Sequence, residues 1–220
     1  LGENIKNIFD VGGLGLDNFK YIKLLNKKEL EKFLKIKFLK KSCLVTFHPI
    51  TLEKNSIYQL KQLLEAIKYF KDITFILTSP NADTTGMKMK KIILNYVKKN
   101  KNLYFYNSLG QLLYLSTMKR VDFILGNSSS GIIEAPELNK FTINVGNRQK
   151  GRLMANSIIQ CKSNKNEIIN KIKLVYKKSN NKKSINNLKY YGKAGASLKI
   201  YNILKKVNLE KIVKKKFYDL

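Results

Sequence analysis

The segment GNSSSG, residues 126–131, has the composition of a phosphate-binding loop. Its two glycines let the backbone approach an anion closely, its three hydroxyls can donate hydrogen bonds, and a following helix would add free N–H groups and a positive dipole end. It is not a Walker loop. The alternative is that the serines only cap that helix. The candidate ligands of an anionic substrate are Asn127, Ser128, Ser129, Ser130 and Gly131.

Two charged residues near this segment favour an anionic ligand. Arg148 lies in a later polar segment, GNRQKGR at residues 146–152, which holds two of the only three arginines in the chain. A lone guanidinium there can meet a charged group. Glu134 follows the serines by about one helical turn, where a carboxylate suits the paired hydroxyls of a ribose. The alternative is an acid that stabilises the helix dipole by about 0.3–1 kcal/mol.

His48 is the only histidine of the chain and follows a short apolar run. An imidazole there can donate a hydrogen bond to a phosphate or transfer a proton. The alternative is a histidine with a purely structural role. Asn81 and Asp83 lie in a third polar segment, SPNADTTG at residues 79–86, and are weaker candidates for the same site.

Composition excludes several classes of protein. Two cysteines and one histidine leave no zinc module and no disulfide scaffold, so we expect no metal and a reducing compartment. With 44% hydrophobic residues the chain of 220 residues can bury a core, and it is not a disordered tail. No apolar run reaches the roughly 18 residues of a membrane span, and the first residues do not resemble a signal peptide. We expect a soluble, cytoplasmic protein with no membrane partner.

The formal net charge is +28, from 43 Lys and Arg against 15 Asp and Glu, which is typical of nucleic-acid-binding proteins. Only three of these 43 residues are arginines, and the 40 lysines are spread along nearly the whole chain. Readout of bases or phosphates prefers the guanidinium. Abundant Lys, Asn, Ile, Tyr and Phe instead indicate coding DNA rich in A and T. We expect no specific nucleic-acid partner, and a non-enzymatic nucleic-acid-binding protein remains the alternative.

Short apolar runs alternate with longer segments of helical period, which predicts an α/β fold, a Rossmann-like parallel sheet with helices on both faces. The predicted strands are 43–47, 73–78, 103–106, 121–125 and 141–145, and the predicted helices are 53–70, 87–97, 109–118, 166–176 and 195–207, with a short one ending near Pro136. Ligands bind beyond the carboxyl ends of such strands. The polar segments named above all follow strands, so they should converge on one edge of the sheet.

The sequence resembles the hydrolysing UDP-N-acetylglucosamine 2-epimerases of sialic-acid and related nonulosonic-acid synthesis. Five segments carry the resemblance, in the family's order: VTFHPIT (45–51), SPNADTTG (79–86), GNSSSGIIEAP (126–136), INVGNRQKGR (143–152) and YGKAGAS (191–197). The non-hydrolysing relatives have an HRRE-like segment where this chain has His48-Pro49-Ile50-Thr51, and an SGG-type loop where it has GNSSSG.

The resemblance implies a two-domain glycosyltransferase-B-like fold whose C-terminal half holds the nucleotide. Ser128 and Ser129, with the loop amides, would bind the diphosphate, Glu134 would hold the ribose, and Arg148 would lie beside the UDP. His48 would contact the diphosphate and assist the leaving group, with Asn81 and Asp83 lining the same pocket. The implied chemistry is anti-elimination of UDP to a glycal, then addition of water with inversion at C2, giving N-acetylmannosamine and UDP. That scheme needs no metal and no redox cofactor.

The resemblance also implies a domain plan. Residues 1–40 would form an interdomain segment and first helix region, because VGGLGLD (11–17) resembles the family's domain junction. Residues 41–177 would be the nucleotide-binding domain. Residues 178–220 would be a polar connector and a C-terminal helix packed on an N-terminal half that this chain lacks. The helix's apolar stripe is Ile200, Ile203, Leu204 and Val207, which in the alternative packs on its own domain.

By this plan the chain is a fragment, a split gene product or a deliberately shortened protein, inactive until the N-terminal half is supplied in the same or a separate chain. That half would carry the acidic residues that handle the protons at C2 and C3. A homodimer is expected from the family. A third hypothesis is the C-terminal domain of a related glycosyltransferase. The sugar stays open between N-acetylglucosamine and a 4-acetamido-6-deoxy relative.

Overall fold

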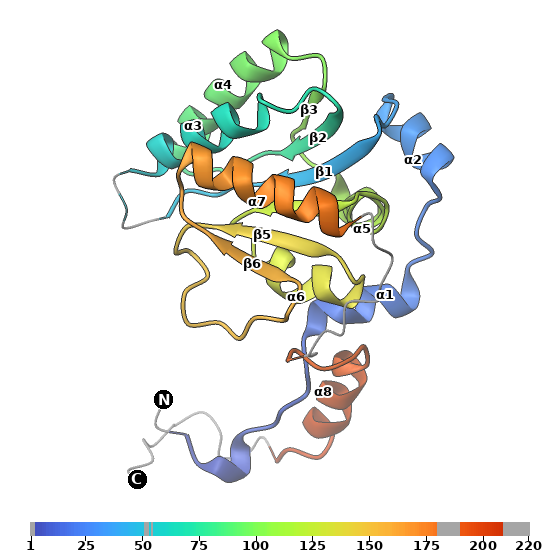
Figure 1. Ribbon diagram of the computed structural model, residues 1–220. Coiled ribbons are helices and arrows are strands. Elements are labelled where there is room, and N and C mark those ends of the chain that lie inside the picture. Colours follow the sequence, from blue (N-terminus) through green and yellow to red (C-terminus); the bar gives the residue numbers. More distant parts are fainter. Residues whose placement is uncertain (1–2, 51–52, 54, 180–189, 209–220) are drawn as a thin grey trace. The chain divides into compact units, whose positions relative to one another are not determined.

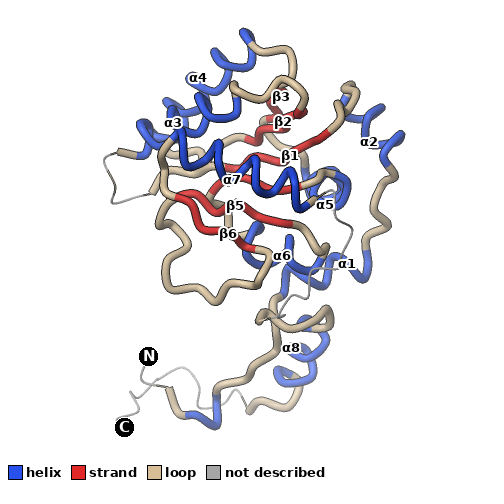
Figure 2. The backbone as a smooth tube through the Cα atoms, viewed as in Figure 1, coloured by secondary structure: helices blue, strands red, loops and turns tan. Residues whose placement is uncertain are grey.

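A computed structural model of the chain describes residues 3–50, 53, 55–179 and 190–208. Its centre is a six-stranded sheet in which every neighbouring pair is parallel and the strand order is β3-β2-β1-β4-β5-β6 (Figures 1 and 2). The strands are β1 (Lys41–Thr46), β2 (Ile73–Thr78), β3 (Leu103–Tyr106), β4 (Phe123–Gly126), β5 (Phe141–Val145) and β6 (Ile158–Cys161). This is the order of a doubly wound, Rossmann-like sheet. The predicted α/β class is confirmed.

Helices cover both faces of this sheet. α3 (Ser56–Ile67) contacts α4 (Thr84–Lys99) and α7 (Lys165–Lys178), and these three helices lie on one face. α5 (Gly110–Arg120) and α6 (Ser130–Glu137) lie on the other face, with α2 (Lys27–Leu34) against α5 (Figure 1). Side chains of β1 and β2 are buried along their whole length, as expected for central strands of a parallel sheet.

The predicted strands 73–78, 103–106 and 141–145 have the predicted bounds, and the other two shift by up to two residues. Helix α4 begins at Thr84, three residues before the predicted start, because the Asp83 side chain accepts a hydrogen bond from the Gly86 N–H at 2.7 Å and caps the helix. The predicted loop 79–86 is therefore wrong in its last residues.

Two elements of this sheet domain had no predicted bounds of their own, although a first helix region was expected within residues 1–40. β6 is a four-residue edge strand whose first three residues are only partly covered, so its hydrophobic pattern is weak. α2 is eight residues long and starts with a capping box, in which Asn26 accepts from the Glu29 N–H at 3.0 Å and the Glu29 carboxylate accepts from the Asn26 N–H at 2.7 Å.

The chain divides into two compact units, residues 23–190 and residues 1–22 with 191–220. The sequence placed its boundaries after residues 40 and 177 instead, and its plan for the segment 178–220 falls partly outside the described residues. Whether the C-terminal helix packs on another domain stays a prediction. Of the predicted apolar stripe, Leu204 is exposed and the other three side chains are partly buried.

The smaller unit joins two segments that lie far apart in the sequence. The Gly13 N–H donates to the Tyr191 carbonyl oxygen at 2.7 Å. The buried carboxylate of Asp17 accepts hydrogen bonds from the N–H groups of Gly195, Ala196 and Ser197, at the start of α8 (Ala196–Leu204). The Ser197 side chain and these N–H groups hold the pKa of Asp17 well below its usual range.

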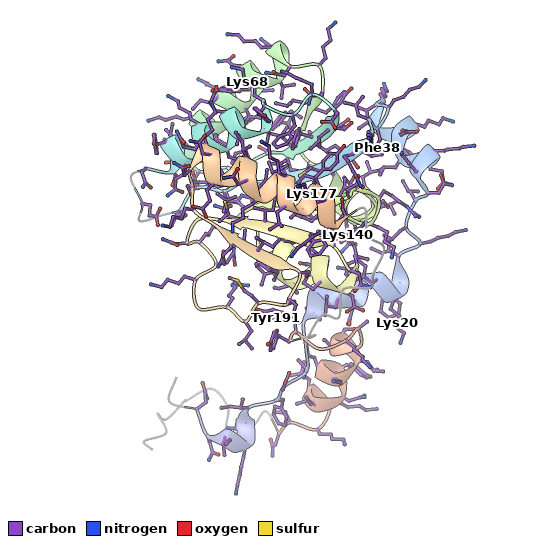
Figure 3. The ribbon with its side chains drawn as sticks, in the orientation of Figure 1. Lys20, Phe38, Lys68, Lys140, Lys177 and Tyr191 are labelled. Atoms are coloured by element: carbon purple, nitrogen blue, oxygen red, sulfur yellow. The ribbon has the colours of Figure 1, made fainter. Side chains whose placement is uncertain are left out.

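The lysines are distributed over many elements of the larger unit. Lys68 follows α3, Lys177 lies in α7, and Lys140 precedes β5 (Figure 3). Lys140 is partly buried, and its ammonium donates to the Val121 carbonyl oxygen at 2.6 Å. Burial lowers the pKa of Lys140 to about 8.

Within the described ranges, no helix has the length and apolar character needed to cross a membrane. The same part of the chain contains no group of three or more His, Cys, Asp or Glu side chains that could hold a metal ion.

Replacing Asp17 by Ala should release the start of α8, because three backbone N–H groups lose a charged acceptor. Hydrogen exchange of the α8 amides should become fast, while the amides of the central strands β1 and β2 keep their protection. The matched control is Asp10→Ala, which removes only an exposed bond from the Gly12 N–H at 3.2 Å and should leave α8 protected. Equal protection of α8 in both variants would contradict the assigned role of Asp17.

Candidate functional site

The strand order reverses between β1 and β4, and these neighbouring strands end together at the paired residues Thr46 and Gly126. In open α/β sheets the crevice at such a switch point is the preferred ligand site. The chain leaves β1 toward His48 and leaves β4 into the serine segment. The site is therefore built from the loops that follow these two strands and the neighbouring β5.

Gly126 permits the tight approach of the two strand ends. Its φ of +136° is in the region that favours glycine, and a Cβ atom there would lie 2.0 Å from the Thr46 carbonyl oxygen. The next residue, Asn127, donates its N–H to the same oxygen at 3.1 Å. The first glycine of the segment therefore serves contact between backbones.

Asn127 joins three loops. Its side-chain oxygen accepts from the His48 N–H at 2.7 Å, and its side-chain nitrogen donates to the His48 carbonyl oxygen at 2.9 Å. Its own carbonyl oxygen accepts from Arg148 Nη1 at 3.0 Å and from Gln149 Nε2 at 2.7 Å. His48 and Arg148, which are 100 residues apart, are thus held beside the serine loop, as the sequence predicted.

The serines contribute in different ways. α6 begins at Ser130, and Ser129 stands at the N-cap without a side-chain bond to the helix backbone. The Ser128 and Ser130 hydroxyls are 3.0 Å apart, and Ser128 Oγ accepts from the Ser130 N–H at 3.3 Å. Ser130 Oγ also lies 2.5 Å from the Tyr114 hydroxyl. Helix capping therefore does not account for all three hydroxyls.

Gly131 permits close packing below the loop. A Cβ atom there would lie 2.7 Å from Thr142 Cγ2 on β5. Its missing side chain lets α6 approach the sheet, and with it the loop that precedes the helix.

Burial sets the charges in the site. Burial, and after it the nearby Arg148 guanidinium, lowers the pKa of His48 to about 4, while Asp83 opposes the shift. His48 is thus neutral at pH 7, and Arg148 supplies the positive charge. Burial also raises the pKa of Glu134, and among the described residues its Oε2 is buried without a hydrogen-bond partner. Among the described residues, the site offers N–H and hydroxyl donors, the Arg148 cation, and the Glu134 carboxylate, one oxygen of which lacks a partner.

The third predicted segment is placed unequally. Asp83 caps α4 and its charge acts on His48. Asn81 is exposed, and its backbone oxygen lies where a Cβ on Gly86 would clash, at 1.7 Å. Among the described residues, no hydrogen bond joins the Asn81 side chain to the other candidates, so its binding role stays a prediction.

Sequence reasoning missed Gln149 and Tyr114. Gln149 is 2% exposed and bonds to Asn127. In the sequence it is an uncharged residue in a polar loop beside Arg148, and its type does not indicate this bond. Tyr114 lies on α5, where its spacing predicts only helix packing, and no local signal indicates its contact with Ser130.

Comparisons with known proteins identify relatives along the whole chain. The family model described as UDP-N-acetylglucosamine 2-epimerase matches residues 1–205. The GDP/UDP-N,N'-diacetylbacillosamine 2-epimerase (hydrolyzing) of Campylobacter jejuni is 41% identical over 222 residues, covering 100% of this chain and 58% of the relative. Polysialic acid biosynthesis protein P7 of Escherichia coli is 36% identical over 226 residues, covering 100% and 56%.

A solved structure shows the same fold. The co-structure of Staphylococcus aureus MnaA with UDP superposes with a TM-score of 0.73 at 18% identity, covering 100% of this chain and 58% of that one. The chain thus spans somewhat more than half the length of the proteins that it matches.

Gly126→Ala should destabilise the larger unit strongly, because the new methyl group meets the Thr46 carbonyl oxygen, which cannot move without disrupting the paired ends of β1 and β4. Gly151→Ala is the control: its φ is +86°, but a Cβ there meets no atom within 4 Å. That control should cost only the left-handed backbone strain of about 1–2 kcal/mol. Urea unfolding measures both, and equal losses would contradict the close contact at Gly126.

His48 should titrate near pH 4 in the folded chain, and as the only histidine it gives one unambiguous set of imidazole NMR signals. Because its pKa is lower in the folded than in the unfolded state, its contribution to stability is present above about pH 6.5 and is lost as the pH falls toward 4. The variant His48→Gln should lack this part of the pH dependence. A folded-state pKa near 6.5 would contradict the burial of the ring beside Arg148.

Proposed function

Because the chain belongs to the UDP-N-acetylglucosamine 2-epimerase family, we propose that its site at the β1–β4 switch point binds the diphosphate of UDP in a hydrolysing 2-epimerase. Membership agrees with the resemblance of the five sequence segments, and the 41% identity to the hydrolysing 2-epimerase of Campylobacter jejuni favours the hydrolysing type. The observation that carries the proposal is the junction at Asn127, which gathers His48, Arg148 and the serine loop in one place.

Each group then has a task. Ser128 and Ser129, with the amides of the loop that leads into α6, bind the diphosphate, as helix N-termini commonly do. Arg148 neutralises its charge with the N–H groups not used by Asn127. Glu134 holds the ribose, which is supported by a buried carboxylate oxygen that lacks a partner in the described structure. The ribose hydroxyls would supply those missing hydrogen bonds.

His48 is neutral before the ligand arrives, so it can donate one N–H to a phosphate oxygen. The negative diphosphate would raise its pKa and favour the imidazolium. A protonated His48 would then stabilise the charge that develops on UDP as the C1–O bond breaks. This is the sense in which His48 assists the leaving group.

The reaction itself balances with water as the co-reactant. In the first step the C2 proton and UDP leave an activated 2-acetamido sugar, giving a glycal and UDP. In the second step water adds, with OH at C1 and H at C2 on the face opposite to the one that lost it. The name of the Campylobacter relative favours a UDP-linked diacetamido sugar as substrate, with UDP-N-acetylglucosamine as the simpler choice.

We infer that the residues that contact the sugar lie mainly in the region of the curated relatives that this chain does not cover. The chain covers 58% and 56% of the two curated relatives, so we propose that turnover requires the remaining region, in the same or a separate chain. The active assembly would be a cytoplasmic homodimer.

Isothermal titration of the chain with UDP tests the site directly. UDP should bind, and Arg148→Ala should weaken binding about 10- to 100-fold, since a hydrogen bond to a charged group contributes roughly 1.5–3 kcal/mol. The control Arg152→Ala removes the same charge from an exposed position in the same loop and should change the affinity much less. Absence of heat and of NMR shift changes with millimolar UDP in a folded sample would rule out the assignment.

A further inference from the structure

The side chain of Asn127 is used within the protein. The residue is 1% exposed, and both polar atoms of its carboxamide bond to the main chain of His48. The sequence placed Asn127 among the substrate ligands. Resting on the function proposed above, we propose that Asn127 is instead a positioning residue, which fixes the His48 backbone and Arg148 against the serine loop and does not itself bind the nucleotide.

The bond pattern requires asparagine. One carboxamide accepts from the N–H and donates to the C=O of the same residue, His48, and so fixes the backbone on both sides of its Cα atom. Aspartate offers no donor for the carbonyl oxygen. Alanine offers neither group. Pro49 further restricts His48 to extended backbone. The backbone that carries the imidazole is thereby held by the Asn127 side chain and restricted by Pro49.

The main chain of Asn127 sets the third loop. A carbonyl oxygen has two lone pairs, and here both have donors, Arg148 Nη1 and Gln149 Nε2. The second donor comes from a side chain that is 2% exposed and whose own oxygen is buried without a partner among the described residues. Gln149 therefore acts through Asn127, and it holds the loop that carries Arg148.

This arrangement predicts what happens when the carboxamide is removed. The His48 backbone loses both anchors, and the imidazole gains freedom to leave its buried position beside Arg148. The charged groups that act on it are Arg148 and Asp83, and desolvation is the largest cause of its low pKa. Release to solvent should move that pKa from about 4 toward the ordinary value near 6.5.

The experiment compares Asn127→Ala with Asn102→Ala, each confirmed as folded by its NMR spectrum. Asn102 is also buried and donates twice to main-chain oxygens, of Phe70 and Ile73, but it lies at the opposite end of the sheet. The His48 pKa should rise in Asn127→Ala, and UDP binding should weaken about tenfold or more, as expected for the loss of a hydrogen bond that holds charged groups. Asn102→Ala should lose stability and change neither quantity.

Two further measurements separate the possible failures. If Asn127→Ala does not fold, Asn127→Ser is measured in the same way, and in the unaltered chain the His48 amide should exchange as slowly as the amides of β1. If the unaltered chain does not bind UDP, the proposed function fails, while the His48 pKa and amide exchange still test whether Asn127 holds His48 in place. An unchanged His48 pKa in a folded Asn127 variant, or fast exchange of the His48 amide, would overturn the inference.

Discussion

The close approach of the carboxyl ends of β1 and β4 is the constraint on which the site depends. The Thr46 carbonyl oxygen sits where a side chain on Gly126 would begin, and it accepts the N–H of Asn127. That contact fixes the position of Asn127, and Asn127 in turn holds the loops after β1 and β5. Through Gly126 and Asn127, the register between β1 and β4 therefore determines where His48, Arg148 and the serines lie relative to one another.

The same constraint explains why a formal charge of +28 does not by itself make a binding site. A large net charge attracts anions from a distance and raises their rate of encounter. Fixed donors decide which anion stays, because they are oriented before the ligand arrives. Among the described residues joined by Asn127, the cation is the Arg148 guanidinium, and the imidazole beside it is neutral at pH 7. An arriving diphosphate would meet this fixed positive charge and a set of N–H and O–H dipoles, which favours a ligand of matching shape.

The sequence predicted the buried central strands well because their side chains face protein on both sides and form apolar runs. It missed β6, since an edge strand of four residues with partial exposure leaves a weak pattern. It found the candidate residues that carry charge or stand in glycine-rich loops. It could not find the roles of Asn127 and Gln149, because their bonds reach residues 79 and 22 positions away and depend on register between strands. Gly126 was expected to face an anion, yet its freedom is used for a backbone contact.

Asp17 and Asn127 each connect backbone segments through side-chain hydrogen bonds. One is a carboxylate and the other a carboxamide, and this difference has a physical reason. Asp17 meets only hydrogen-bond donors, three N–H groups and the Ser197 side chain, so a carboxylate satisfies all of them and gains from the positive end of α8. Asn127 must satisfy an N–H and a C=O of one residue, so it needs a donor as well as an acceptor. A carboxylate at position 127 would also place a negative charge beneath the serine loop. A neutral amide therefore braces the site and leaves its field suited to an anion.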